Sequence, residues 1–323
     1  MPILFDQNTH VFHLSNDRVS YIFRLAGGNR FDTAFMVADQ MKANLGVEKF
    51  DAVIVASGTN FADALSGSYL AAVKKAPILL SFTTDAINNQ VKDYIRNNLT
   101  PGGTVYILGG ASAVPESMER GLDGFVINRL QGDDRFGTNL AILAEAGVGD
   151  KPVLVCTGLS FADSLSASAT ELPILLVWKD LTVAQKVFLA NLNGNDLYVI
   201  GGESAVSKAM EDQIAEYGVV ERVQGSNRFE TSIAIAERFF YKPETVVLAY
   251  AWNFPDGLCG GPLAVSTDAP LILTMDHYEA RAAEYIQGQG VKAGTILGGS
   301  ALISDDGIRQ IFDLDSDMRI PQK

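Results

Sequence analysis

Short, continuous apolar runs alternate with amphipathic segments along this chain. In the first third the runs lie at 53–56, 78–80 and 105–108, and such runs are typical of strands that are buried on both faces. Ahead of the first run, apolar side chains recur at steps of three and four residues from Phe31 to Met41, with Asp39 and Lys42 on the opposite face. This alternation predicts an α/β fold with parallel sheets and helices on their faces.

The same pattern occurs three times, and four sequence blocks mark it in a fixed order. The first block reads RLAGGNRFDT (24–33), RLQGDDRFGT (129–138) and RVQGSNRFET (222–231). It is followed by NFADALS, SFADSLS and NFPDGLC, then by PILL, PILL and PLIL, and last by ILGG, VIGG and ILGG. We therefore predict three domain-sized modules at 24–128, 129–221 and 222–323, the last with an acidic, frayed tail at 313–317.

Two local features follow from these patterns. Residues 1–23 stand outside the repeats, and alternating apolar side chains on either side of 15–18 predict a short N-terminal β-hairpin. Within the first block, Asn29, Asp134 and Asn227 are good N-caps, and Asp32 and Glu230 three residues later would complete capping boxes. The second module has a shorter spacing between the SFADSLS and PILL blocks, which predicts a shorter helix there.

Composition excludes several classes of protein. The chain has 323 residues, with 25 Lys and Arg against 38 Asp and Glu, a net charge of −13, so binding to nucleic acid by phosphate neutralisation is disfavoured. No apolar run approaches the roughly 18 residues of a membrane span, so no membrane insertion is predicted. No basic start followed by an apolar stretch is visible, so we expect a cytoplasmic protein or a mature or truncated form.

The residues that commonly carry chemistry are few. Cys156 and Cys259 hold different module positions and are predicted to be packing residues. His10 and His13 would point to opposite faces of a strand, and His277 is solitary, so no metal and no cofactor are expected. Gly-x-Ser-x-Gly and Walker A motifs are absent, and the Gly-Gly pairs lack the spacing of a dinucleotide site. These absences favour a protein that is not an enzyme.

The remaining polar residues recur in all three modules, at loops where strands lead into helices. Ligands usually bind at this edge of a parallel sheet. The set comprises the arginines Arg30, Arg135 and Arg228, the aspartates Asp63, Asp163 and Asp256, and the loop residues Asn60, Ser160 and Asn253. In one interpretation each arginine forms an ion pair with the aspartate of its own module and only locks the structure. In the other, the arginines and helix N-termini hold anionic groups of a polymer, with the loop residues beside them.

The four blocks resemble the cell wall binding repeat type 2 of clostridia and related Gram-positive bacteria, from Arg24 to about Phe312. The resemblance implies three tandem Rossmann- or Toprim-like modules in a pseudo-threefold arrangement. It also implies non-covalent anchoring at the cell surface to an anionic, teichoic-acid-like wall glycopolymer, usually beside a separate enzymatic or adhesive domain. The third module departs from the pattern, because Trp252 replaces Thr59 and Leu159, and Pro255 replaces an alanine.

The sequence is compatible with three functions. The favoured one is a wall-anchoring protein that grips a chain-like ligand at repeated loop sites, because linked weak sites gain avidity. The second is an enzyme or a nucleotide- or sugar-binding protein that uses the diverged third module, where Trp252 is present. The third is a structural scaffold in which the arginines and aspartates only hold the modules together.

Overall fold

The computed structural model describes residues 21–323, so most of the predicted N-terminal hairpin, with His10 and His13, lies outside the described residues. Within them the chain forms three four-stranded sheets, and every pairing between strands is parallel. Eleven α-helices and one 3-10 helix accompany these sheets in the described part of the chain. The predicted α/β class with three parallel-sheet modules is confirmed.

The strands follow the apolar runs of the sequence. The first sheet has the order β3-β2-β4-β5 and consists of β2 (Phe50–Ser57), β3 (Ile78–Ser81), β4 (Leu99–Leu108) and β5 (Val126–Leu130). The second has the order β7-β6-β8-β9 and consists of β6 (Val153–Thr157), β7 (Ile174–Val177), β8 (Leu197–Ile200) and β9 (Val220–Val223). The third has the order β1-β12-β10-β11 and consists of β1 (Tyr21–Leu25), β10 (Thr245–Tyr250), β11 (Leu271–Thr274) and β12 (Ala293–Leu297).

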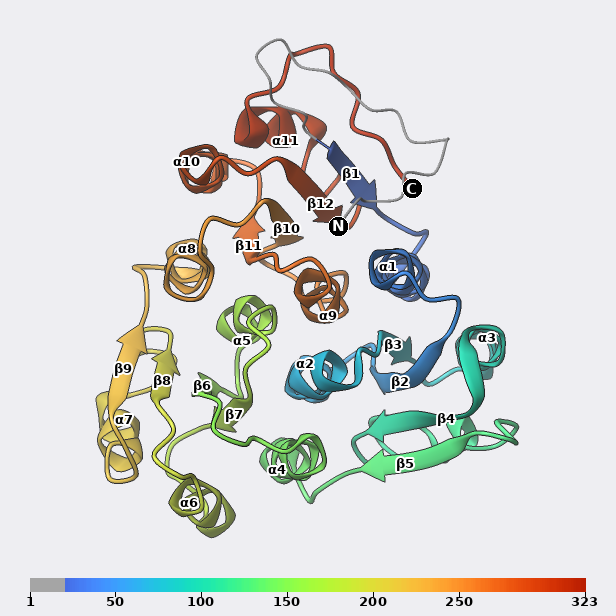
Figure 1. Cartoon of the computed structure of the whole chain (residues 1–323), viewed down its shortest axis with the longest axis vertical. Helices are drawn as coiled ribbons and strands as arrows, with labels where there is room; N and C mark the ends of the chain where they lie inside the picture. Colours follow the sequence, from blue (N-terminus) through green and yellow to red (C-terminus); the bar gives the residue numbers. More distant parts are fainter. Residues whose placement is uncertain (1–20) are drawn as a thin grey trace.

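In each sheet one edge strand comes from the start of a different repeat than the other three strands. We call β5, β9 and β1 the borrowed strands. The module boundaries predicted at 128/129 and 221/222 fall inside β5 and β9, which complete the sheets of the preceding modules. The boundary at 23/24 falls inside β1, which pairs with β12 from the far end of the chain. The three modules are therefore linked in a closed ring (Figure 1).

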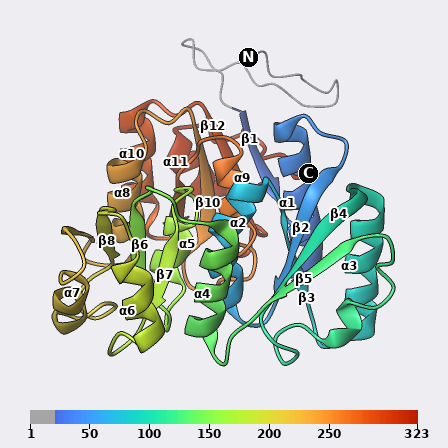
Figure 2. The same ribbon diagram turned by 60° about the horizontal axis from the view of Figure 1, so that its bottom comes forward.

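The helices lie at different distances from the centre of the ring. The first module has α1 (Arg30–Leu45), α2 (Phe61–Lys74) and α3 (Asp85–Asn98), and the second has α4 (Arg135–Ala146), α5 (Ala162–Ala167), α6 (Val183–Ala190) and α7 (Lys208–Ile214). The third has α8 (Arg228–Phe239), α9 (Gly260–Val265), α10 (Glu279–Gln289) and α11 (Asp305–Phe312). Helices α2, α5 and α9 lie nearest the centre (Figure 1), whereas α3 and α6 lie at the periphery, as the turned view of Figure 2 also shows.

The inner helices differ in length. The helix of the second module is short as predicted, since α5 has 6 residues and α2 has 14, but α9 of the third module, where no shortening was predicted, also has only 6. In the third module, however, Asp256 does not open a helix: it lies in a turn, and α9 begins four residues later at Gly260. Gly257 stands where the other modules have Ala64 and Ser164, and glycine lowers helix propensity at this point.

Three phenylalanines meet at the centre of the ring. The rings of Phe61, Phe161 and Phe254 contact one another edge to face, with centroids 5.7–6.2 Å apart. Each comes from the second sequence block of a different module: Phe61 begins α2, Phe161 directly precedes α5, and Phe254 lies in the loop ahead of α9. This edge-to-face geometry is the favoured one for aromatic pairs, so the triad ties the three modules together at one point.

The C-terminal tail differs from the prediction. The acidic residues Asp313, Asp315 and Asp317 are exposed, but the chain beyond them is not frayed. Ile320 is buried, and the backbone N–H of Lys323 donates to the carbonyl of Arg24 at 3.0 Å. The tail therefore covers the outer edge of β1, where unpaired backbone groups would otherwise remain.

Candidate functional site

The first sequence block forms the loop and first turn that present each candidate arginine. The glycine at its fourth position (Gly27, Gly132 or Gly225) admits no side chain, because a Cβ there would lie 2.2–2.4 Å from the residue five positions later. The backbone N–H of the same glycine donates to the hydroxyl of the block's threonine at 3.1 Å in every module. Gly and Thr thus fix a tight loop whose last residue, an arginine, begins the helix.

The helix caps are as predicted, but the capping boxes are not. Asn29, Asp134 and Asn227 each accept hydrogen bonds from two backbone N–H groups of the first turn. Asp32 accepts instead from the side-chain amide of Asn29, at 2.8 Å. Glu230 forms a two-pronged ion pair with Arg281 at 2.7 and 2.9 Å, because α10 brings that guanidinium close to the start of α8.

Arg30, Arg135 and Arg228 occupy equivalent, half-buried positions. In each, Nη1 donates to the backbone carbonyl where the next strand of the same module ends: Gly58 at 2.6 Å, Gly158 at 2.5 Å and Ala251 at 2.7 Å. Among the described residues this is the one donor that each guanidinium uses, although a guanidinium carries five N–H donors. The arginines are therefore held in place while most of their donors remain available.

The aspartates that face these arginines belong to the neighbouring modules. Arg135 acts electrostatically on Asp63 of the first module, Arg228 on Asp163 of the second, and Arg30 on Asp256 of the third. The predicted pairing of each arginine with its own module's aspartate is therefore wrong. No ion pair within 4 Å joins the two sets among residues 21–323, so the charges face each other across each junction without direct contact.

Aromatic contacts follow the same cyclic order. Arg135 lies 5.7 Å from the ring centroid of Phe61, and Arg228 lies 5.6 Å from that of Phe161, again in the neighbouring module. The candidate site is thus a junction between two modules, and at two of the junctions a phenylalanine of the central triad lies beside the arginine.

Each aspartate is confined against the Gly-Gly pair of its own module. Gly109, Gly201 and Gly298 have φ values of +89°, +96° and +94°, and a Cβ at these positions would lie 2.3–2.8 Å from the aspartate Oδ2. The left-handed backbone and the close approach of the carboxylate both require glycine. The role of these glycines is to make room for a carboxylate.

Burial perturbs the titration of all three aspartates. It raises the pKa of Asp63, against the opposing effect of Arg135. It raises the pKa of Asp163 from 3.8 to about 6, although Arg228 opposes the rise. Burial also raises the pKa of Asp256, opposed by Thr33 and Arg30. A carboxylate that loses its hydration shell is destabilised in the charged form, which explains the common direction.

The junction between the first and third modules contains an open cavity of about 220 Å³. Its lining combines Arg30 and the loop at 27–29 from the first module with Asn253, Asp256 and Gly299 from the third. Asn253 is exposed at its rim. The structure therefore brings together Arg30 and Asn253, two of the residues predicted to bind the ligand, although they come from different modules.

Asn60 and Ser160 occupy the positions in the other modules that correspond to Asn253. Asn60 is exposed and caps α2 by accepting from the backbone N–H of Ala62 at 3.2 Å. Ser160 is half-buried and directly precedes Phe161, which lies beside Arg228. Each thus directly precedes a phenylalanine of the triad along the chain.

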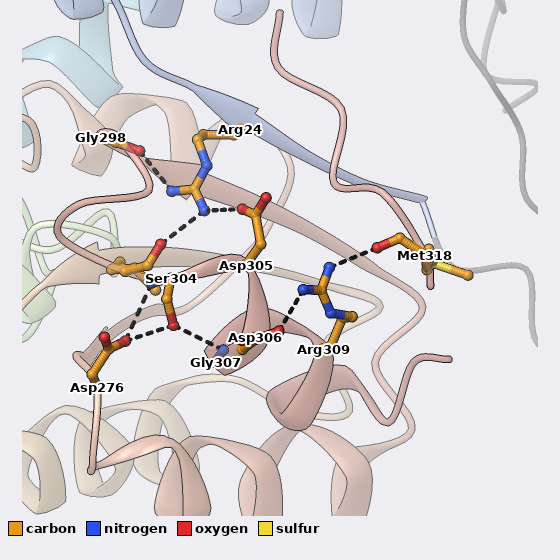
Figure 3. A network of polar contacts seen from close by, with 10 residues as sticks. Arg24, Asp276, Gly298, Ser304, Asp305, Asp306, Gly307, Arg309 and Met318 are labelled. Carbon is orange, nitrogen blue, oxygen red and sulfur yellow. Dashed lines mark hydrogen bonds and ion pairs between the residues drawn. The ribbon is translucent and has the colours of Figure 1, made fainter. Parts of the chain in front are cut away.

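A second set of arginines was not singled out from the sequence, although they open each repeat. Arg24 is only 2% exposed, and its guanidinium donates at 2.8 Å to the carbonyls of Gly298 and Ile303 and to the Asp305 carboxylate (Figure 3). The equivalent arginines of the other two repeats each bind a carbonyl of the Gly-Gly pair and a carboxylate of the preceding module. Arg129 binds Gly109 and Glu119. Arg222 binds Gly201 and Glu211. These arginines lock each borrowed strand to its sheet, and their triplicate repetition is the signal that could have identified them.

The cysteines are free and buried, as predicted. Burial raises the pKa of both the Cys156 and the Cys259 thiols above the ordinary range. A buried thiol with a raised pKa is a poor nucleophile. None of the helices between residues 21 and 323 combines the length and apolar composition needed to cross a membrane.

Comparison with known proteins gives consistent matches over the three repeats. The family model described as cell wall binding domain 2 (CWB2) matches residues 24–119, 129–211 and 222–307. N-acetylmuramoyl-L-alanine amidase LytC of Bacillus subtilis is 25% identical over 87% of this chain and 56% of the relative. The amidase enhancer of the same organism is 26% identical over 92% of this chain and 41% of the relative.

Solved structures agree with the fold. Cwp8 from Clostridium difficile superimposes with a TM-score of 0.80 at 26% identity, covering 90% of this chain and 51% of that chain. Cwp6 from the same organism gives a TM-score of 0.77 at 23% identity, over 97% of this chain and 52% of that chain, which supports the fold alone. This chain spans about half the length of the proteins that it matches.

Proposed function

The chain belongs to the cell wall binding domain 2 family, and from that premise we propose that it anchors non-covalently to the cell wall by binding an anionic, teichoic-acid-like secondary polymer at the junctions between its modules. Family membership supports cell-wall binding and a location at the cell surface. The proposal adds the ligand class and the place where it binds. In it the chain is the binding part of the assembly, and any enzymatic activity lies elsewhere.

One observation carries the proposal: every junction presents a half-buried arginine whose donors are largely unused, beside a carboxylate of the neighbouring module. A guanidinium presents paired donors that match phosphate and carboxylate oxygens. The negative charge of the facing aspartate offsets the positive charge of the arginine, so the net charge of each junction is near zero. An anion can therefore bind the fixed guanidinium, but the junction does not attract anions non-specifically. This selectivity suits a chain whose net charge is −13 and which otherwise repels polyanions.

Repetition supplies affinity that one junction alone would lack. A single half-buried guanidinium offers a weak site, but sites on one rigid body act at high effective concentration toward a repeating ligand. Linked engagement raises avidity by about 10²–10⁴ over the single site. The ring of borrowed strands holds the junctions at fixed separations, which supports simultaneous contact with one polymer chain.

The test is co-sedimentation with purified Gram-positive walls, before and after chemical removal of the secondary polymer. We expect the untreated walls to retain the protein and the stripped walls to release it. The decisive variant is Arg135→Gln combined with Asp63→Asn, which removes the cation without leaving its facing carboxylate unopposed. Loss of one of the linked sites is expected to weaken wall binding about tenfold.

The matched control is Arg96→Gln with Asp93→Asn, which removes an exposed ion pair on the outer helix α3. This control is expected to bind as the parent chain does, with a similar melting temperature. Equal binding to intact and stripped walls would refute a polymer ligand. Unchanged binding of the Arg135 and Asp63 double variant would place the site away from the junctions.

A further inference from the structure

The third module exposes two aromatic side chains where the other modules have smaller or aliphatic ones. Trp252 is 53% exposed and replaces Thr59 and Leu159 of the other repeats. Tyr278, 42% exposed, is the N-cap residue of α10, whereas α3 and α6 have threonine at that position. The three junctions are therefore equivalent in their arginines but not in their surroundings.

Both rings are held rigidly with one side covered. The Arg228 guanidinium lies 4.2 Å from the centroid of Trp252, and the indole N–H donates to the Sδ of Met275 at 2.5 Å. Tyr278 is stacked on the buried Phe229 with centroids 4.0 Å apart and planes 11° apart. Because these contacts cover one side of each ring, the exposed area lies on the other. Such fixed rings lose little conformational entropy on binding.

The position of this aromatic pair connects two of the candidate sites. Trp252 is stacked on Arg228, which belongs to the junction between the second and third modules. The next residue along the chain, Asn253, lines the cavity between the third and first modules. A chain-like ligand that engages Arg228 and the cavity at Arg30 would pass over Trp252.

We propose that Trp252 and Tyr278 form a platform on which a sugar ring of the wall polymer stacks, so that this part of the surface recognises the glycan and the arginines recognise its anionic groups. This inference rests on the proposed function and makes its ligand specific. A pyranose has an apolar C–H face that fits an aromatic ring and hydroxyls that stay in contact with polar neighbours. The exposed Ser226, Asn227 and Asn253 nearby suit those hydroxyls better than a lipid chain or a continuous apolar protein surface.

The test measures binding of the full chain to polymer released from Gram-positive walls. The variants are Trp252→Leu, which installs the residue of the second module, and Tyr278→Thr, which installs the N-cap residue of the other modules. Each is expected to weaken polymer binding about fivefold to tenfold, the lower end of the effect known for aromatic side chains on which nucleic-acid bases stack. Trp252→Phe, which keeps an aromatic face, should recover most of the affinity, and Tyr241→Thr, at an 87% exposed site, serves as the control.

Fluorescence gives a second readout. The chain has two tryptophans, so a Trp178→Phe background leaves Trp252 as the sole indole. Its emission should change on titration with the released polymer but not with inorganic phosphate. An equal response to phosphate, or unchanged affinity in Trp252→Leu and Tyr278→Thr while the parent chain binds, would overturn the platform and leave wall anchoring intact. Failure of the parent chain to bind the polymer would overturn both proposals.

Discussion

Asp163 is expected to destabilise the native protein at neutral pH, and Asp163→Asn should therefore stabilise it. Burial raises the pKa of this carboxyl from 3.8 to about 6, although Arg228 opposes the rise. The native state therefore binds more protons than the unfolded state between these two pH values. It follows that the free energy of unfolding falls as pH rises through this interval, and the full penalty is present above about pH 6.

The size of the penalty follows from the same rise in pKa. A change from 3.8 to about 6 is equivalent to about 3 kcal/mol at 25 °C. Asp163 is half-buried rather than fully enclosed, so solvent screens part of this cost and about 1–2 kcal/mol is expected at pH 7.5. Asparagine has nearly the same shape but carries no charge, so it removes the penalty without opening a cavity beside Gly201.

The assay is urea unfolding of the parent chain and of Asp163→Asn, followed by far-UV circular dichroism at several pH values from 4 to 7.5. The two proteins should have similar midpoints near pH 4 and should diverge above pH 6, with the variant more stable. Asp150→Asn, at an exposed site, is the control and should show no such divergence. A variant less stable than the parent at pH 7.5, or a difference that does not depend on pH, would refute the reasoning.

Two further substitutions test the architecture. Gly201→Ala should cost about 2–4 kcal/mol, because a Cβ would lie 2.3 Å from Asp163 Oδ2 at a φ of +96°, whereas Gly46→Ala, at a φ of +66° in open space, should cost only about 1 kcal/mol. Equal losses in thermal unfolding would contradict this steric argument. Glu211→Gln should cost about 1–3 kcal/mol, because the Arg222 side chain is only 11% exposed and would lose its charged partner, and Glu284→Gln at an exposed ion pair should cost little. Burial alone would raise the pKa of Glu211, but hydrogen bonds from Arg222 and Lys208 lower it, so the contribution of Glu211 should disappear as pH falls below 4.5, and its persistence under acid would argue against the pair.

Local features were predictable because their causes lie within a few residues along the chain. Asn29, Asp134 and Asn227 cap helices because a short side chain there reaches the N–H groups of the first turn. The capping boxes failed for a reason of the opposite kind. Glu230 had a stronger partner in Arg281, which lies on a helix fifty-one residues further along the chain.

The sequence by itself determined the class of fold, the three modules and their strands, and it singled out Arg30, Asn253 and Asp256 among the residues that line the cavity, because hydrophobic periodicity and repeated motifs act locally. The sequence left open which module's aspartate each arginine faces. Each of the three arginines (Arg30, Arg135 and Arg228) could face any of three equivalent aspartates. The repeated motifs are so similar that the sequence does not favour one pairing over another. Only the packing around the Phe61, Phe161 and Phe254 triad and the exchange of β1, β5 and β9 decided that each arginine faces the neighbouring module's carboxylate. The pairing depends on how whole modules dock against each other. Charge and steric fit across a junction depend on distances in space, and these are not determined by separation along the chain.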